Sequence, residues 1–227
     1  MKKFILSIAI FLLIDTQSFS HVDHYAKYNY LEYELFRNNV SIGYHKYDFL
    51  RDGDNLSIKS EVNFKITKLG VDLYKYFAKS EENYEKGIFK SYSSNTKQNK
   101  KDRFVKINLN SKSKNLEIDG SSYKGLADKE FIVGTWWNHE IIKAKAQISG
   151  ISGRIIEQTV TFVGKETVKI DDKTYNTLRF NFKSSDESLP ESKKLNTDIW
   201  YEEGTYLWIK AAFKKTGYWE YRIKKVN

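Results

Sequence analysis

Apolar and polar residues alternate along most of the chain from Tyr28 onwards. Residues 56–66 show the pattern most clearly, because one parity there is largely apolar and the other is polar. The apolar parity contains Leu56, Ile58, Val62, Phe64 and Ile66. Successive side chains of a β-strand point to opposite faces of a sheet, so a period of two predicts strands with one face buried and one face in water.

Stretches of the same kind recur to the end of the chain. They are separated by short segments rich in Gly, Asn, Asp and Ser, which are turn residues. Asn38 and Asn39, for example, predict a tight hairpin turn. The predicted strands cover residues 28–37, 40–50, 56–66, 71–78, 80–86, 88–95, 103–110, 115–118, 153–163, 166–170, 175–184, 197–201, 206–213 and 219–225.

These strands predict a mainly β fold, built as a single antiparallel, strongly curved sheet in a barrel or half-barrel arrangement. A flat open sheet of about ten or more strands would leave long edges exposed, and curvature avoids this. No fixed repeat and no long linker divides the chain, so residues 21–227 are expected to form one domain. The pattern changes after Gly120, where Thr135 is a candidate N-cap for one short helix within residues 135–148.

Residues 1–20 differ from the rest of the chain. A basic start precedes an apolar run at residues 4–14, and Ser18 and Ser20 place small side chains at a cleavage site. This is the anatomy of a secretory signal peptide, and we expect cleavage after Ser20. The apolar run is shorter than the roughly 20 residues that span a bilayer, and no later stretch approaches that length. We therefore expect an exported, soluble protein, and because the chain has no Cys, we expect no lipid anchor.

The formal net charge of +9 bears on which kinds of partner the protein can bind. The lysines are scattered and alternate with apolar positions, as on the wet face of a sheet, which favours a role in solvation. Attraction to an anionic membrane surface or to acidic envelope polymers is the alternative. Nucleic-acid binding is not expected, because the sequence shows no basic stripe on a recognisable binding fold.

Catalytic motifs are absent from the sequence. It contains no Gly-x-Ser-x-Gly elbow, no phosphate-binding Gly-rich loop, no His-Glu-x-x-His and no Cys. We therefore expect no catalytic residues and no cofactor. The enzyme alternative depends on His139 and Glu140, which follow Trp136, Trp137 and Asn138 and offer the one local acid–base pair.

The four His residues show no defined metal-ligand spacing, so no metal site is expected. The remaining alternative is copper, held by the amine and imidazole of His21 after cleavage together with a second His.

Aromatic side chains are abundant, with 16 Tyr, 14 Phe and 5 Trp. Such large, strand-prone side chains usually fill the interior of a sheet. The alternative, compatible with the first, is that they line a concave sheet that holds an apolar ligand such as an acyl chain. The candidate ligand-binding residues are Tyr44, Tyr76, Trp136, Trp137, Asn138, Trp200 and Tyr201.

Several short phrases, taken in order, cover nearly the whole of the expected mature chain. They are Ser-Ile-Gly-Tyr-His at 41–45, Tyr-Lys-Tyr at 74–76, Glu-Asn-Tyr-Glu-Lys-Gly at 82–87, Ser-Ser-Asn-Thr at 93–96, Thr-Trp-Trp-Asn at 135–138, Asp-Ile-Trp-Tyr-Glu at 198–202 and Tyr-Arg at 221–222. The set resembles the domain of unknown function 6134 family of exported bacterial proteins, which looks similar to the larger domain of unknown function 3108 group. Tyr84 departs from the pattern, where Trp is expected.

The resemblance implies a periplasmic, β-rich protein whose fold looks like the half-barrel of lipoprotein carriers, and it brings no catalytic residues. The aromatic-rich alternating strands motivate the leading hypothesis, a non-enzymatic binding or carrier protein for a hydrophobic or amphipathic envelope molecule, such as a lipid. The second hypothesis is a structural or assembly protein that binds an envelope protein or an anionic membrane surface. The third is an enzyme that uses the segment from Trp136 to Glu140.

Overall fold

The computed structural model describes residues 23–227, and it confirms the prediction of a mainly β fold. The strands are β1 (Tyr30–Arg37), β2 (Val40–Asp52), β3 (Asn55–Lys68), β4 (Val71–Glu85), β5 (Ile88–Gln98), β6 (Lys101–Leu109), β7 (Asn115–Gly120), β8 (Lys124–Asp128), β9 (Ile132–Val133), β10 (Ala146–Ile148), β11 (Ile155–Ile170), β12 (Lys173–Ser184), β13 (Asn196–Glu202), β14 (Trp208–Lys215) and β15 (Gly217–Val226). Among these described residues, two 3-10 turns, η1 (Asp23–Tyr25) and η2 (His139–Ile142), account for the helical residues. The proposed signal peptide, residues 1–20, lies outside the described residues.

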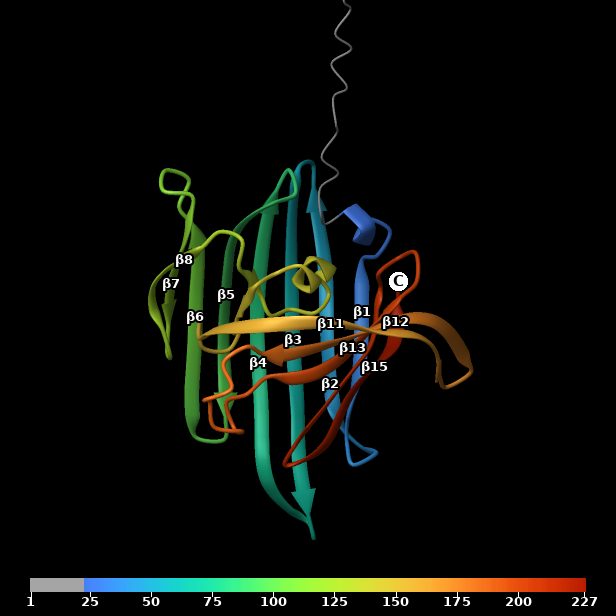
Figure 1. The fold of residues 1–227 in the computed structure, drawn as a ribbon. Helices are drawn as coiled ribbons and strands as arrows, with labels where there is room; N and C mark the ends of the chain where they lie inside the picture. Colours follow the sequence, from blue (N-terminus) through green and yellow to red (C-terminus); the bar gives the residue numbers. More distant parts are fainter. Residues whose placement is uncertain (1–22) are drawn as a thin grey trace, which may run out of the picture.

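All the strands join in one sheet whose middle is formed by the first and last strands (Figure 1). β1 pairs with both β2 and β15. From β1 the chain meanders outwards through β2 to β8, and this half of the sheet is the first arm. The second arm runs from β15 through β14 to β9. The sheet ends at β8 and β9, which do not pair with each other, so it is open and is not a closed barrel.

The prediction of a wholly antiparallel sheet is wrong at one place, because β9 and β10 are parallel. Their connection, residues 134–145, is a crossover that contains η2. Parallel strands require a connection of about a dozen residues, whereas a tight turn can join antiparallel strands. This crossover, which the meander pattern could not reveal, places residues 134–138 against the inner face of the first arm.

The two arms face each other across the interior. In Figure 1, β11–β13 cross in front of β2–β4 and β6. The main hydrophobic cluster draws on both arms, including Phe49 and Ile58 from the first and Phe182 and Ile199 from the second. A smaller cluster packs Val133 and the end of β10 against β6 and β7. Burial between the arms is therefore what holds this open sheet in its bent form.

Close approach of the arms requires glycine at one loop. Gly153 has a φ of +79°, and a Cβ there would lie 2.9 Å from Cγ2 of Ile118 on β7. A larger residue would therefore strain the backbone and push the loop away from the sheet.

The predicted helix is also different in the structure. Only a 3-10 turn forms, and Asn138 caps it by accepting a hydrogen bond from the backbone N–H of Glu140 at 3.1 Å. Thr135 does not cap a helix, because its hydroxyl donates to Glu82 at 3.1 Å. Residues 146–148 form β10, and all three are buried. Tertiary packing rather than local propensity therefore determines the secondary structure of this segment.

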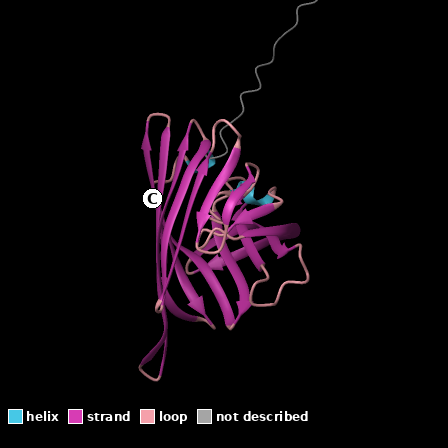
Figure 2. Cartoon of the chain, turned by 90° about the vertical axis from the view of Figure 1, so that its left-hand side faces the viewer, coloured by secondary structure: helices cyan, strands magenta, loops and turns pink. Residues whose placement is uncertain are grey.

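The β3–β4 hairpin is longer than the alternation predicted. β4 runs without a break through residues 71–85 and pairs with β3 along nearly its whole length. Its tip projects beyond the neighbouring hairpins at one end of the sheet, as Figures 1 and 2 show. No helix among residues 23–227 is long and apolar enough to cross a membrane.

Candidate ligand-binding cavity

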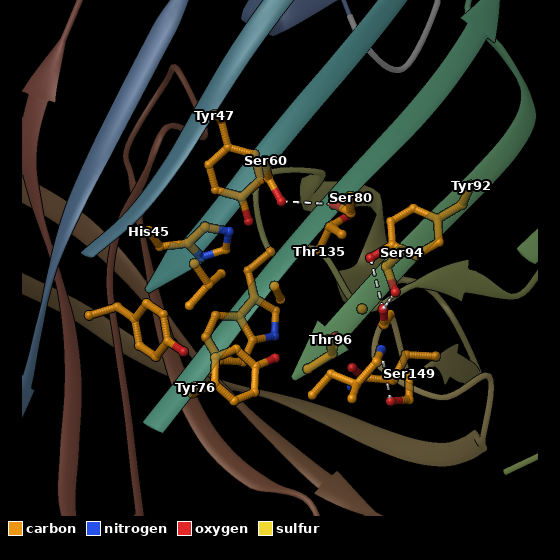
Figure 3. A pocket seen from close by; sticks show the side chains of 18 of the residues that line it. His45, Tyr47, Ser60, Tyr76, Ser80, Tyr92, Ser94, Thr96, Thr135 and Ser149 are labelled. Carbon is orange, nitrogen blue, oxygen red and sulfur yellow. Dashed lines mark hydrogen bonds between the residues drawn. The ribbon is translucent and has the colours of Figure 1, made fainter. Parts of the chain in front are cut away.

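A cavity of about 240 Å³ lies on the inner face of the first arm (Figure 3). Its floor is formed by the inward residues of β2 to β5. Its other walls come from residues 134–136, Gln147, residues 149–151, Ile156 and Tyr221 of β15. The crossover between β9 and β10 therefore helps to build the cavity. This volume is below the roughly 300–1,000 Å³ that is usual for small-molecule sites, so the cavity can hold a small molecule or part of a larger one.

One side of the cavity is aromatic. It is formed by His45, Tyr47, Tyr76, Trp136 and Tyr221. The rings of His45 and Tyr47 lie 4.3 Å apart between centroids. Burial raises the pKa of the Tyr76 and Tyr221 hydroxyls well above the ordinary value, so these rings stay neutral. The aromatic side therefore offers an uncharged surface to an apolar group.

The other side carries hydroxyl groups. They belong to Ser60, Ser80, Ser94, Thr96, Thr135 and Ser149. The Ser60 and Ser80 oxygens are 2.8 Å apart, and Tyr92 donates a 3.0 Å hydrogen bond to the carbonyl of Gly150. Because serine side chains are short, they leave space in a part of the sheet whose inner face is otherwise filled by larger residues. The cavity is thus amphipathic, with rings on one side and small polar groups on the other.

His45 is the most unusual residue of the wall. Burial lowers the pKa of its imidazole to about 3, so the ring is neutral at physiological pH. Its Nδ1 is shielded from solvent and has no hydrogen-bond partner among the described residues. A buried polar atom without a partner costs roughly 1–3 kcal/mol. A ligand group that hydrogen-bonds to this nitrogen would recover that cost.

Glu82 lies behind the cavity and anchors the crossover. Its side chain is fully buried on β4 and accepts hydrogen bonds from the Tyr84 hydroxyl, from Nε1 of Trp137 at 3.1 Å and from the Thr135 hydroxyl at 3.1 Å. Burial raises the pKa of this carboxyl to about 7, although the three hydrogen bonds oppose the rise. The crossover residues that line the cavity are therefore tied to β4 through one carboxyl group.

Five of the candidate residues named from the sequence gather around this site. Tyr76 and Trp136 line the cavity itself. Trp137 is fully buried behind them, and Asn138 donates to the Tyr84 hydroxyl at 3.4 Å. Tyr201 reaches from β13 and donates to the Trp136 carbonyl at 2.9 Å. The last three therefore support the wall rather than form it.

The other two candidates lie on the outer face of the sheet. The Tyr44 hydroxyl donates to Glu61 at 2.7 Å. The Trp200 ring lies between Arg179 and Lys210, each 4.9 Å from the ring centroid. Both are next to an inward residue in the sequence, and neighbours on a strand point to opposite faces. Neither Tyr44 nor Trp200 contributes to the cavity.

Sequence reasoning missed the groups that make the cavity polar. His45 shares its parity with Tyr47 and Phe49, which are buried, so its inward direction could have been deduced. Ser60 likewise interrupts a run of apolar inward residues, between Ile58 and Val62. Glu82 gave no such signal, because its partner Trp137 is 55 positions away in the sequence.

His139 and Glu140 do come together, as the enzyme hypothesis requires, but outside the cavity. Nδ1 of His139 lies 2.8 Å from Nε2 of His24, and Nε2 of His139 lies 3.3 Å from the Glu140 carboxylate. The His139 ring also stacks on Tyr206 with centroids 4.5 Å apart. Within residues 23–227, no group of three or more His, Cys, Asp or Glu side chains is placed to hold a metal ion. His21 lies outside the described residues.

The sequence comparison decides the family. The family described as "Domain of unknown function (DUF6134)" matches residues 33–224. The chain belongs to this family. The match covers every strand from β2 to β14, and the resemblance seen in the sequence is thereby confirmed. The similarity to the 3108 group stays a prediction. No curated protein matches the chain.

A solved structure supports the fold of this DUF6134 chain. It is the crystal structure of a "Beta-barrel-like Protein of Domain of Unknown Function DUF1849 from Brucella abortus". The two chains are 10% identical and superpose with a TM-score of 0.60 over 87% of this chain and 96% of the other. At this identity the similarity concerns the fold alone.

Proposed function

We propose that this protein is a non-enzymatic binding or carrier protein, and that it holds a small amphipathic molecule in the cavity between β2–β5 and the crossover. The apolar part of the ligand lies against Tyr76 and Trp136, and a polar group hydrogen-bonds to His45. The observation that carries the proposal is that His45 lines this cavity while its buried Nδ1 has no partner among the described residues.

The size and chemistry of the cavity narrow the ligand class. A volume of about 240 Å³ favours a single acyl chain or a small ring system over a whole two-chain lipid. A neutral imidazole offers one donor and one acceptor, so it favours an uncharged polar group such as a hydroxyl or carbonyl.

The setting of this activity is part of the proposal. Residues 1–20 act as a signal peptide, and the protein works in the periplasm on a molecule of the cell envelope. Its bent sheet, a half-barrel in the manner of lipoprotein carriers, provides the concave face. The support is the order of basic, apolar and small residues at positions 1–20.

Native mass spectrometry of protein purified gently from a periplasmic extract tests the proposal. We expect an adduct that solvent extraction removes and that identifies the ligand by its mass. Ala78→Phe fills the cavity from β4 and should abolish the adduct, because Ala78 lines the wall. Lys79→Phe places the same ring on the outer face and should retain it.

Two results would contradict the carrier function. One is an unmodified mass for the wild-type protein under all gentle conditions. The other is an adduct that persists unchanged in a folded Ala78→Phe variant, since the ligand would then lie elsewhere.

A further inference from the structure

The tip of the β3–β4 hairpin exposes apolar side chains to solvent. Leu69 is 94% exposed, Val71 60% and Leu73 56%. Val40, on the adjacent β1–β2 hairpin, is 64% exposed. The two hairpins are neighbours, because residues 40–42 and 65–67 line one shallow groove. Figure 2 shows that this hairpin tip projects from the end of the sheet, and apolar side chains exposed at a projecting point indicate a contact surface.

The backbone conformation at the tip of this hairpin disfavours a leucine at position 69. Leu69 has a φ of +50° and Gly70 a φ of +77°, as a two-residue type I′ hairpin turn requires. Asn, Asp or Gly is usual at the first position, and a branched apolar residue there is disfavoured. The β1–β2 turn shows the usual solution, with Asn38 and Asn39. The turn conformation therefore does not explain the leucine at position 69, and its exposed side chain indicates another role.

Basic residues surround this tip. Lys65, Lys68 and Lys75 lie on the hairpin itself, where Asp72 is the one acidic residue of the segment 65–75. The β5–β6 turn is held beside it by a hydrogen bond from Asn99 N–H to the Lys75 carbonyl and adds Lys97, Lys100 and Lys101.

The β14–β15 turn lies at the same end of the sheet. Arg37 at the end of β1 donates to the Thr216 carbonyl in this turn, which carries Lys214 and Lys215. A large part of the net charge of +9 is thus concentrated where the apolar tip projects.

We propose that this end of the sheet docks on a membrane of anionic phospholipids. Leu69 and Val71 enter the headgroup region, and the surrounding lysines bind lipid phosphates. An apolar insertion ringed by cations matches the charge and polarity of such an interface, where each basic residue near the surface adds attraction. The proposal does not rest on the cavity: it assigns the protein an orientation on the membrane whether or not a ligand is carried.

Fluorescence of a single labelled position tests the insertion. The chain has no Cys, so Leu69→Cys can be labelled at one site with an environment-sensitive nitrobenzoxadiazole dye. Asp54→Cys, on the exposed turn at the opposite end of β3, is the matched control. Protein starting at His21 keeps every described strand and removes the apolar run at residues 4–14.

Vesicles of equal parts phosphatidylglycerol and phosphatidylcholine should shift the emission of the dye at position 69 to shorter wavelength and raise its intensity several-fold. Vesicles of phosphatidylcholine alone should not, and the dye at position 54 should respond to neither. Equal responses at positions 69 and 54, or no response at 69 with anionic vesicles, would overturn the proposal.

Two sets of substitutions separate the contributions of charge and leucine. Replacing Lys65, Lys68 and Lys75 with Gln should weaken vesicle binding about 100-fold, because each lysine near an anionic surface contributes roughly a factor of five. The same change at Lys90, Lys112 and Lys129, on the other end, is the control for net charge and should have little effect. Equal losses for both sets would contradict the assigned orientation.

Leu69→Asn should weaken vesicle binding about 10-fold while leaving the protein at least as stable, because Asn suits the left-handed turn position. Unchanged binding by this variant would show that charge alone attracts the protein, and insertion would be rejected. Ala78→Phe should bind vesicles like the wild type. Loss of the ligand and loss of membrane binding are therefore distinguishable.

Discussion

The inner and outer faces of this sheet shift the pKa values of carboxyl groups in opposite directions. On the inner face, burial raises the pKa of Glu82 to about 7 and lowers that of His45 to about 3. On the outer face, hydrogen bonds from Trp200 and Arg179 lower the pKa of the Glu166 carboxyl. The outer Glu166 is therefore held in its charged form by its partners, whereas burial disfavours the charged forms of the inner Glu82 and His45. This difference locates the candidate site on the inner face.

Removing one tryptophan from each face should give the largest effect. Trp137→Ala deletes a fully buried ring and a donor to Glu82, and should lower the free energy of unfolding by about 4 kcal/mol. Trp200→Ala removes a ring held against Arg179 and Lys210 and should cost roughly 2 kcal/mol. Urea unfolding of both variants measures the difference, and equal losses would contradict the contrast between the faces.

The pH dependence of stability should follow the buried carboxyl. The pKa of Glu82 is about 7 in the folded protein and near 4.5 when unfolded, so the folded state holds the extra proton between these values. Its contribution is therefore fully present below pH 4.5 and decreases by roughly 3 kcal/mol as the pH rises to 7. His45 acts in the opposite sense, because its depressed pKa makes stability fall as the pH drops from 6.5 towards 3.

Comparison with Glu82→Gln isolates the carboxyl from His45. The stability of the wild type minus that of the variant should decline across pH 4.5 to 7, measured by urea unfolding at several pH values. A difference that stays constant, or that rises with pH, would show that Glu82 is ionised in the folded state.

Removing one tyrosine hydroxyl from each face should give the smallest effect. Tyr201→Phe removes the hydrogen bond to the Trp136 carbonyl in a buried setting and should cost about 1–2 kcal/mol. Tyr44→Phe removes an outer hydrogen bond to Glu61 that water can replace, at about 0.5 kcal/mol. Thermal unfolding resolves this pair, and a larger loss for Tyr44→Phe would reverse the assignment of faces.

The sequence predicts the strands well because the alternation of apolar and polar residues within each strand shows which side chains face the interior and which face water. The alternation at 56–66 lies within β3, and the Asn38–Asn39 turn joins β1 to β2. Because Tyr44 and His45 are neighbours on one strand, the alternation would also have predicted that their side chains point to opposite faces. What alternation cannot predict is pairing between distant segments.

The crossover shows this limit. The sequence of residues 134–145 predicts a loop and a helix start. In the structure, contacts with Glu82 and with Tyr201 place this segment against the inner face of the sheet. Those contacts span 55 and 65 positions, and they create both the parallel pair and one wall of the cavity. No local pattern carries that information, so the cavity appears only when the chain is folded.

The Nδ1 resonance of His45 tests the central claim most directly. Nitrogen NMR of the imidazole can be recorded on gently purified protein and again after solvent extraction. We expect a neutral ring at pH 5, because its pKa is about 3, and an Nδ1 resonance that moves when the ligand is removed and returns when the extract is added back. An Nδ1 resonance that is the same before and after extraction, or a protonated ring at pH 5, would contradict a ligand bound at this nitrogen.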